Sequence, residues 1–201
     1  MGKQLGFHID SRYCSGCKTC QVACKDRADL KVGQLWRRVY MYEDGGWFKV
    51  GAAWRSSVAS YWVGISCNHC ENPKCVDICP TGAMQKREED GVVMVNTDLC
   101  VGCRSCAMAC PYDAPQYNPD TGKMGKCDAC SDRRAEGKRP VCVDACPFQL
   151  ITFGPMDELE KTKGGTPWVK GMADPRLTRP SLLINPATGA ARSPQEGKGN
   201  Q

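Results

Sequence analysis

Apolar residues along this chain occur in short runs, of which residues 92–95 and 182–184 are examples. Residues 5–10 have the pattern of a strand, and residues 92–95 form a second predicted strand after the charged turn at 87–91. We expect strands near residues 6–9 and 150–153 to pair with each other. No run approaches the roughly 18 apolar residues of a membrane span, and no signal-peptide pattern is visible at the start. Any membrane location is therefore expected to come from a partner.

Aromatic residues concentrate between positions 35 and 65, on both sides of Gly45 and Gly46. The pattern predicts an antiparallel hairpin insertion that caps the rest of the fold or meets a partner, with ordinary core packing as the alternative. The residues concerned are Trp36, Tyr40, Tyr42, Trp47, Phe48, Trp54, Tyr61 and Trp62.

The part of the chain after Pro155 is predicted to hold one short helix, at residues 156–161. Beyond it the sequence is rich in Gly, Pro, Thr and Ser, a composition that buries too little apolar surface to fold alone. We expect residues 161–201 to be an extended tail that is either frayed or laid across another subunit. Residues 131–141 carry many charges and are expected to form a solvated helix and turn.

Sixteen cysteines fall into four blocks of four, and none is left over. Blocks one and three share the spacing C-x2-C-x2-C-x3-C, whereas blocks two and four read C-x2-C-x4-C-x3-C and C-x2-C-x11-C-x3-C. The first of these spacings, followed by proline, is typical of bacterial ferredoxins, in which the fourth cysteine binds the other cluster of a pair. In chain order the blocks are Cys14, Cys17, Cys20, Cys24; Cys67, Cys70, Cys75, Cys79; Cys100, Cys103, Cys106, Cys110; and Cys127, Cys130, Cys142, Cys146.

The spacing suits iron–sulfur cubanes for a physical reason. Closely spaced cysteines on a tight loop can turn three sulfurs toward one cluster, while the fourth begins a helix that points toward a neighbouring cluster. Pro80, Pro111 and Pro147 follow the last cysteine of three blocks and redirect the chain there. Block one has Lys25 instead, so its helix is expected to run on through Ala28 to Leu30.

Other uses of the cysteines fit less well. A disulfide framework would crowd several thiols onto one loop, and zinc sites often include histidine, of which this chain has only His8 and His69. Redox C-x-x-C chemistry needs one exposed pair rather than four complete quartets. Four cubane clusters are therefore predicted, and the chain is expected to carry electrons and to catalyse no reaction itself.

Composition and charge agree with a protein that folds around its metal. The chain has 201 residues, of which 41% are hydrophobic and 7% aromatic, so the apolar core should be modest. The formal net charge of +5 counts every cysteine as neutral. Bound thiolates on four cores of roughly +2 each add about −8 and bring the holoprotein to about −3. The 27 Lys and Arg residues are thus expected to compensate clusters rather than to bind nucleic acid.

The order of the blocks predicts an α+β fold with two nested ferredoxin-like lobes, each holding two clusters. Blocks one and four would form the outer lobe from residues 1–34 and 120–160. Blocks two and three would form the inner lobe from residues 66–119, and the aromatic hairpin at 35–65 would be inserted between them.

The chain resembles the iron–sulfur electron-transfer subunits of molybdopterin oxidoreductases, and within that group the B subunits of the anaerobic dimethyl sulfoxide reductase family. The resemblance covers about residues 5–160. The residues that carry it lie at positions 14–20, 66–73, 110–118, 135–138 and 153–159.

The resemblance implies one ligand set for each cluster. Cys103 stands where the related nitrate reductase subunit has tryptophan and a three-iron cluster, so four [4Fe-4S] clusters are expected here. The implied sets are Cys14, Cys17, Cys20 and Cys146 for cluster one; Cys24, Cys127, Cys130 and Cys142 for cluster two; Cys67, Cys70, Cys75 and Cys110 for cluster three; and Cys79, Cys100, Cys103 and Cys106 for cluster four.

The resemblance further implies a hetero-oligomer in which a membrane anchor subunit oxidises quinol and a molybdopterin catalytic subunit reduces the terminal acceptor. This chain would relay single electrons between them, held peripherally at the membrane by its partners. In the family the twin-arginine signal of the catalytic partner directs export, which would place the chain on the extracytoplasmic side. The alternatives are the corresponding subunit of a selenate, tetrathionate or polysulfide reductase or a formate dehydrogenase, and a free polyferredoxin.

Three residues near the cysteines are further candidates for a role. Lys18 and Arg104 lie inside cluster loops, where a cation would raise the local reduction potential. The alternative for each is a solvated side chain. His69 is expected to form a hydrogen bond or to lie at the surface rather than to bind iron. Backbone N–H groups near Gly16 and Gly102 should donate to cluster sulfurs, because glycine allows close approach.

Overall fold

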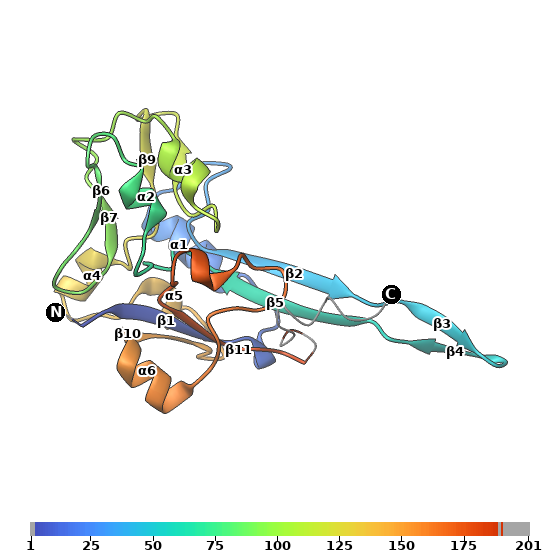
Figure 1. Ribbon diagram of the computed structural model, residues 1–201. Coiled ribbons are helices and arrows are strands. Elements are labelled where there is room, and N and C mark those ends of the chain that lie inside the picture. The colour runs from blue at the N-terminus through green and yellow to red at the C-terminus, as the bar shows by residue number, and fades with distance from the viewer. Residues whose placement is uncertain (1–2, 189, 191–201) are drawn as a thin grey trace.

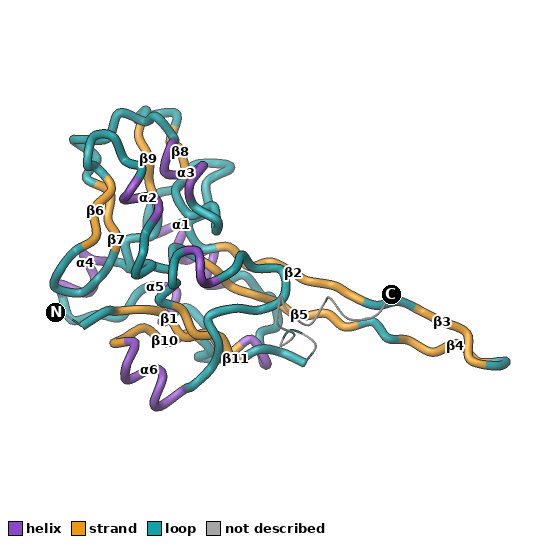
Figure 2. The backbone as a smooth tube through the Cα atoms, in the orientation of Figure 1, coloured by secondary structure: helices purple, strands orange, loops and turns teal. Residues whose placement is uncertain are grey.

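The computed structural model describes residues 3–188 and residue 190. The chain forms a body of short strands, short helices and many loops, from which one long two-stranded arm projects (Figures 1 and 2). In Figure 1 two small hairpins lie above a three-stranded sheet in this body. Helices and strands are both present, as the sequence predicts.

The sheet has β1 (Leu5–Asp10) as its middle strand, with β10 (Ile151–Pro155) on one side and β11 (Leu182–Asn185) on the other. β1 and β10 are antiparallel, which confirms the predicted pairing of residues 6–9 with 150–153. β11 runs parallel to β1.

β11 corrects the prediction that residues 161–201 form an extended tail. Leu182, Leu183 and Ile184 are buried, and Val169 is buried as well. The composition of the segment is too polar for a core of its own, but these few apolar side chains bury their surface against the sheet that β11 joins. Residues 189 and 191–201 of the predicted tail lie outside the described part of the chain.

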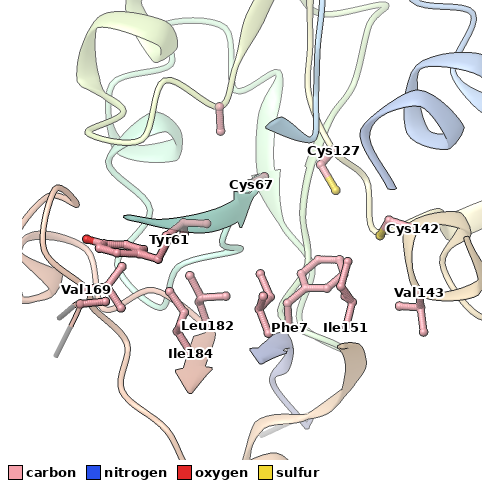
Figure 3. Close-up of a cluster of buried hydrophobic side chains, with 14 residues drawn as sticks. Phe7, Tyr61, Cys67, Cys127, Cys142, Val143, Ile151, Val169, Leu182 and Ile184 are labelled. Carbon is pink, nitrogen blue, oxygen red and sulfur yellow. The ribbon is translucent and has the colours of Figure 1, made fainter. Parts of the chain in front are cut away.

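The core of the sheet also contains cysteines. Phe7 on β1 and Ile151 on β10 belong to one buried cluster with the side chains of β11, and Cys67, Cys127 and Cys142 belong to it as well (Figure 3). A second buried cluster lies under the two small hairpins and is likewise built partly from cysteines. It contains Cys75, Ala83, Met84, Val93, Cys100, Cys106 and Met124.

The arm consists of two consecutive antiparallel strand pairs. β2 (Arg38–Asp44) pairs with β5 (Ala59–Ile65) next to the body, and β3 (Trp47–Val50) pairs with β4 (Ala53–Ser56) at the far end. Tyr61 on β5 is buried in the core, whereas every residue of β3 and β4 is exposed. The aromatic residues of this segment are therefore divided between the core and the open arm.

The remaining elements are short and connect the cysteine blocks. They are the 3-10 turn Ser11–Tyr13, α1 (Thr19–Arg27), α2 (Lys74–Asp77), β6 (Met84–Lys86), β7 (Val93–Val95), α3 (Ser105–Ala109), β8 (Gln116–Asn118), β9 (Lys123–Gly125), α4 (Ser131–Ala135), α5 (Val141–Asp144), α6 (Met156–Lys163) and the 3-10 turn Pro175–Leu177. α4 and α6 lie where the sequence predicts helices. Among residues 3–188 and 190 no helix has the length and apolar character to cross a membrane.

Helix α1 ends at Arg27, about one turn earlier than the expected end at Leu30. Asp29 has a φ of 44°, and the N–H of Leu30 donates to the carbonyl of Lys25 at 3.0 Å. This is the geometry of a Schellman motif, which closes a helix through a left-handed residue. The Lys25 ammonium also donates to the carbonyl oxygens of Leu30 and Lys31, so the residue in the place of proline helps to turn the chain.

Gly6 and Gly154 face each other across β1 and β10 and provide a matched test of this packing. A Cβ at Gly6 would lie 2.3 Å from the Ser181 carbonyl oxygen, whereas a Cβ at Gly154 has nothing within 4 Å. We predict that Gly6→Ala destabilises the holoprotein by about 1–3 kcal/mol through overpacking, which lowers Tm by several degrees. Gly154→Ala should melt close to the parent. Equal melting temperatures for the two variants would contradict the placement of Ser181 against β1.

Candidate metal centres

The four cysteine loops share one backbone conformation. In each block the residue just before the second cysteine has a positive φ: 71° at Gly16, 44° at His69, 67° at Gly102 and 54° at Ala129. A left-handed residue turns the chain sharply between the first two cysteines. Glycine indicates this turn in blocks one and three. In blocks two and four the same position is a histidine and an alanine, which do not indicate a positive φ in the sequence.

A cavity at the first loop brings together cysteines of blocks one and four. Cys14, Cys17, Cys20 and Cys146 line it, together with mostly apolar neighbours. Cys146 comes from the turn after α5, 122 positions after Cys24 closes block one. The first three cysteines of block one therefore meet the fourth cysteine of block four.

A second cavity of the same kind lies beneath the small hairpins. The cysteines that line it are Cys79 from block two and Cys100, Cys103 and Cys106 from block three. Met84, Val95 and Met124 contribute apolar surface around them. A small, sulfur-lined apolar space is what a cubane cluster requires of its protein surroundings.

The other eight cysteines form two groups. Their members are identified because neighbouring thiols raise one another's pKa. Burial raises the pKa of Cys24 to about 12, and the Cys142 and Cys130 thiols contribute to the rise. Burial likewise raises the pKa of Cys127 well above its ordinary value, with Cys24 as the largest contributor among the neighbouring thiols. Cys24, Cys127, Cys130 and Cys142 therefore lie close together.

Cys67, Cys70, Cys75 and Cys110 form the remaining group. Burial raises the pKa of Cys75 to about 12, with the Cys67, Cys110 and Cys70 thiols adding to the rise. For Cys70 burial also raises the pKa to about 12, again with Cys67 and Cys110 contributing. Each of the four groups thus contains three cysteines of one block and a fourth from another block.

The raised pKa values belong to metal-free thiols and show what the metal must supply. A thiol with a pKa of about 12 remains protonated near neutral pH, because burial penalises the charged thiolate. Iron binds the thiolate and releases the proton, so metal binding provides the free energy that burial of these charges costs. The buried cysteines are therefore suited to be thiolate ligands of a metal.

The groups are linked in a row. α1 carries Cys20 and Cys24, and it packs against α5, which carries Cys142, so the first group adjoins the second. α2 carries Cys75, and it packs against α3, which carries Cys106, so the third group adjoins the fourth. The second and third groups are neighbours as well, because the Cys67 thiol is among those that raise the pKa of Cys127.

Backbone N–H groups approach several of the sulfurs. The N–H groups of Met84, Ala114 and Leu150 each donate at 3.4 Å, and their acceptors are the fourth cysteines of blocks two, three and four. Hydrogen bonds to sulfur stabilise added electron density and are one of the determinants of cluster potential. Burial raises the pKa of Cys14, and a backbone hydrogen bond from Gly16 partly offsets that rise.

The arrangement differs from a site for one metal ion. Within the described ranges no three His, Cys, Asp or Glu side chains converge on a position that could hold a single ion. Tetrahedral zinc requires four ligands about 2.0–2.3 Å from one centre. A cubane instead places each thiolate on a different iron, so its ligands surround a larger space.

Comparison with known proteins decides between these kinds of site. Residues 58–156 match the 4Fe-4S dicluster domain family, and residues 13–33 match a 4Fe-4S binding domain. The B subunit of the anaerobic dimethyl sulfoxide reductase of Escherichia coli (strain K12) is 51% identical over 186 residues, which cover 92% of this chain and 90% of that protein. This protein belongs to the family of anaerobic dimethyl sulfoxide reductase B subunits.

More distant relatives are subunits of other reductases. The thiosulfate reductase electron transfer subunit of Salmonella typhi is 41% identical over 75% of this chain and 76% of its own length. The B subunit of the polysulfide reductase of Wolinella succinogenes is 36% identical over 92% of this chain and 96% of its own length. The protein is therefore a non-catalytic electron-transfer subunit with four [4Fe-4S] clusters, as the sequence predicts.

The structure also places the three further candidates from the sequence. The Arg104 guanidinium lies 3.9 Å from the centre of the Tyr117 ring. Arg104 and Lys18 both have positive φ and directly precede α3 and α1. His69 is fully buried and its Nδ1 accepts a hydrogen bond from the Val93 N–H at 3.1 Å. That contact is of the kind expected for His69.

Gly102 allows the fourth cysteine group to be tested without removing a ligand. A Cβ at Gly102 would lie 2.1 Å from the Gly122 carbonyl oxygen, and the φ of 67° is strained for alanine. We predict that Gly102→Ala loses about a quarter of the bound iron, the share of one cluster in four, as measured by anaerobic iron analysis. Gly137→Ala is the control, because Gly137 has a φ of 73° but open space around it. Full iron in Gly102→Ala would show that this close approach does not shape the site.

Proposed function

We propose that this chain is the electron-transfer subunit of a dimethyl sulfoxide reductase-like complex. It relays single electrons from a membrane anchor subunit that oxidises quinol to a molybdopterin catalytic subunit that reduces the terminal acceptor. The observation that carries this proposal is the row of four cysteine groups, in which each end group has an exposed cysteine and neither inner group has one.

Exposure along the row supports this assignment. Cys17 in the first group and Cys103 in the fourth are exposed. All four cysteines of the second group are buried, and the third group has no exposed member. Electrons entering at one surface can thus leave at another, while the ligands of the second group between them stay buried.

The ligand sets follow from the same grouping. Each [4Fe-4S] cluster takes three cysteines from one block and a fourth from its partner block, as in paired ferredoxin clusters. The sulfur-lined cavities and the mutual effects of the thiols support these sets. The sets are Cys14, Cys17, Cys20 and Cys146 for cluster one; Cys24, Cys127, Cys130 and Cys142 for cluster two; Cys67, Cys70, Cys75 and Cys110 for cluster three; and Cys79, Cys100, Cys103 and Cys106 for cluster four.

Two nested lobes follow from these sets. The outer lobe, residues 1–34 and 120–160, holds clusters one and two beside α1 and α5. The inner lobe, residues 66–119, holds clusters three and four beside α2 and α3. The packing of α1 on α5 and of α2 on α3 supports this division. β9 reaches the fourth group from outside the inner lobe, since the Met124 N–H donates to the Cys100 sulfur at 3.4 Å.

The arm supports membership in a complex rather than a free shuttle. Trp47 and Trp54 at its far end are 68% and 65% exposed. A two-stranded hairpin is marginal by itself in water, and exposed apolar clusters of this kind mark interaction sites. Between Gly45 and Val58 the sequence has two basic residues, Lys49 and Arg55, but no acidic residue. We infer that the arm lies in an apolar, acid-rimmed groove of a partner subunit.

Attachment of this chain to the membrane would then be peripheral and indirect. The anchor subunit supplies the membrane span. Export on the twin-arginine signal of the catalytic partner would place the complex on the extracytoplasmic side.

The subunit proposal is tested on the native protein. We predict that gentle anaerobic extraction in detergent yields this chain in one complex with a molybdenum-containing subunit, and that a quinol analogue reduces its clusters in that complex. Gel filtration and EPR spectroscopy provide the two measurements. A protein that elutes alone, near its own 22.0 kDa, with reducible clusters would identify a free polyferredoxin instead.

The role of the arm is tested by removing its aromatic surface. We predict that Trp47→Ser combined with Trp54→Ser lowers the yield of intact complex at least ~tenfold, because two exposed aromatic anchors are lost, while iron content stays unchanged. Leu177→Ser is the control, since Leu177 is 55% exposed but belongs to the second 3-10 turn and not to the strands of the arm. An intact complex in the double variant would show that the arm is not part of the interface.

A further inference from the structure

Arg37 is the most deeply buried cation among the described residues. Its side chain is 1% exposed and is the largest of those that are fully buried. It directly precedes β2, at the base of the arm, and lies over the Phe7 ring with its guanidinium carbon 4.9 Å from the ring centre. A guanidinium stays protonated in proteins, so this position carries a permanent positive charge.

No carboxylate pairs with Arg37 within the part of the chain that the structure describes. Its hydrogen bonds go to the Gly64 carbonyl oxygen at 3.4 Å and the Ser66 hydroxyl at 3.1 Å. Its neighbour Arg38 differs, since that guanidinium lies 2.7 Å from the Asp113 carboxylate. Burial of an uncompensated charge is strongly unfavourable. The charge of Arg37 must therefore be balanced by something other than Asp or Glu.

The groups that act on the Arg37 charge are cysteines of two ligand sets. Cys20 belongs to the set proposed for cluster one, whereas Cys24, Cys127 and Cys142 belong to the set proposed for cluster two. The geometry agrees, because Gly64, whose carbonyl oxygen accepts from Arg37, lines the cavity of the first cysteine group. The backbone of Arg37 also forms a hydrogen bond with Cys24. Arg37 thus lies between the two sets.

We propose that Arg37 is a potential-setting residue that raises the reduction potentials of clusters one and two together. Each electron that a cluster accepts adds one negative charge. A fixed cation in a low-dielectric interior stabilises the reduced form more than the oxidised form, and net charge is one determinant of cluster potential. Because one guanidinium faces both sets, it raises the two potentials together and makes both clusters easier to reduce.

Lys86 provides an internal comparison at a different cluster. Its ammonium donates to the Cys70 carbonyl oxygen at 2.8 Å and to Gln4 Oε1 at 2.7 Å. The thiols of Cys70 and Cys67, both in the set proposed for cluster three, are among the groups that act on it. Removal of its charge should affect cluster three and leave cluster one unchanged.

The test is a redox titration of the anaerobic holo-complex followed by EPR spectroscopy. In Arg37→Met and Arg37→Gln the midpoint potentials of clusters one and two should both shift downward, with clusters three and four unchanged. Arg37→Lys should restore them toward the parent, because it keeps the charge. Lys86→Met should shift cluster three alone, and Arg176→Met should shift none, since Arg176 is exposed and paired with Asp174.

The outcomes separate charge from packing. Unchanged midpoints in Arg37→Met, or equal shifts of all four clusters, would overturn the proposal. If Arg37→Met and Arg37→Gln do not load iron, an Arg37→Lys protein with full iron and parental potentials still supports a role for charge. Failure of all three variants to load would assign Arg37 to packing and overturn the proposal. The inference rests on the proposed ligand sets, which iron content and the number of cluster signals in the parent test separately.

Discussion

Bonds between iron and cysteine sulfur hold this protein together and make electron transfer possible. Half of the sixteen cysteines are buried, and burial makes thiols difficult to ionise. Cys24, Cys70 and Cys75, each with a pKa of about 12, would stay neutral without metal. The helices that carry many of the ligands are too short to form a core by themselves, since α2 and α5 contain four residues each. Cluster binding therefore completes the fold as well as the electron path.

The cysteine spacing predicts the chemistry well, because ligand geometry is local. The pairing of β1 with β10 is also predictable, since both strands flank cysteine blocks that must meet. The position of β11 is not, because its three apolar residues gain their burial from a strand at the other end of the sequence. The left-handed turns at His69 and Ala129 escape prediction because neither residue signals that conformation as glycine does. The early end of α1 depends on a Schellman motif closed by Asp29, which the sequence likewise does not mark with glycine.

The positive charges of the protein are placed to suit electron transfer. Buried and half-buried cations lie beside the cysteine groups, with Arg37 at the first and second and Lys86 at the third. The exposed cysteines lie at the two ends of the row. In this arrangement the body of the protein sets the positions and potentials of its clusters, and the arm is available to bind a partner.

Occupation of all four cysteine groups by iron–sulfur cubanes underlies both the fold and the function described above. The decisive experiment is anaerobic determination of iron, acid-labile sulfide and zinc in the fully loaded protein. About sixteen irons and about sixteen sulfides per polypeptide are expected, with no stoichiometric zinc. Zinc in the cysteine groups, or far fewer irons than about sixteen in fully loaded protein, would contradict this interpretation.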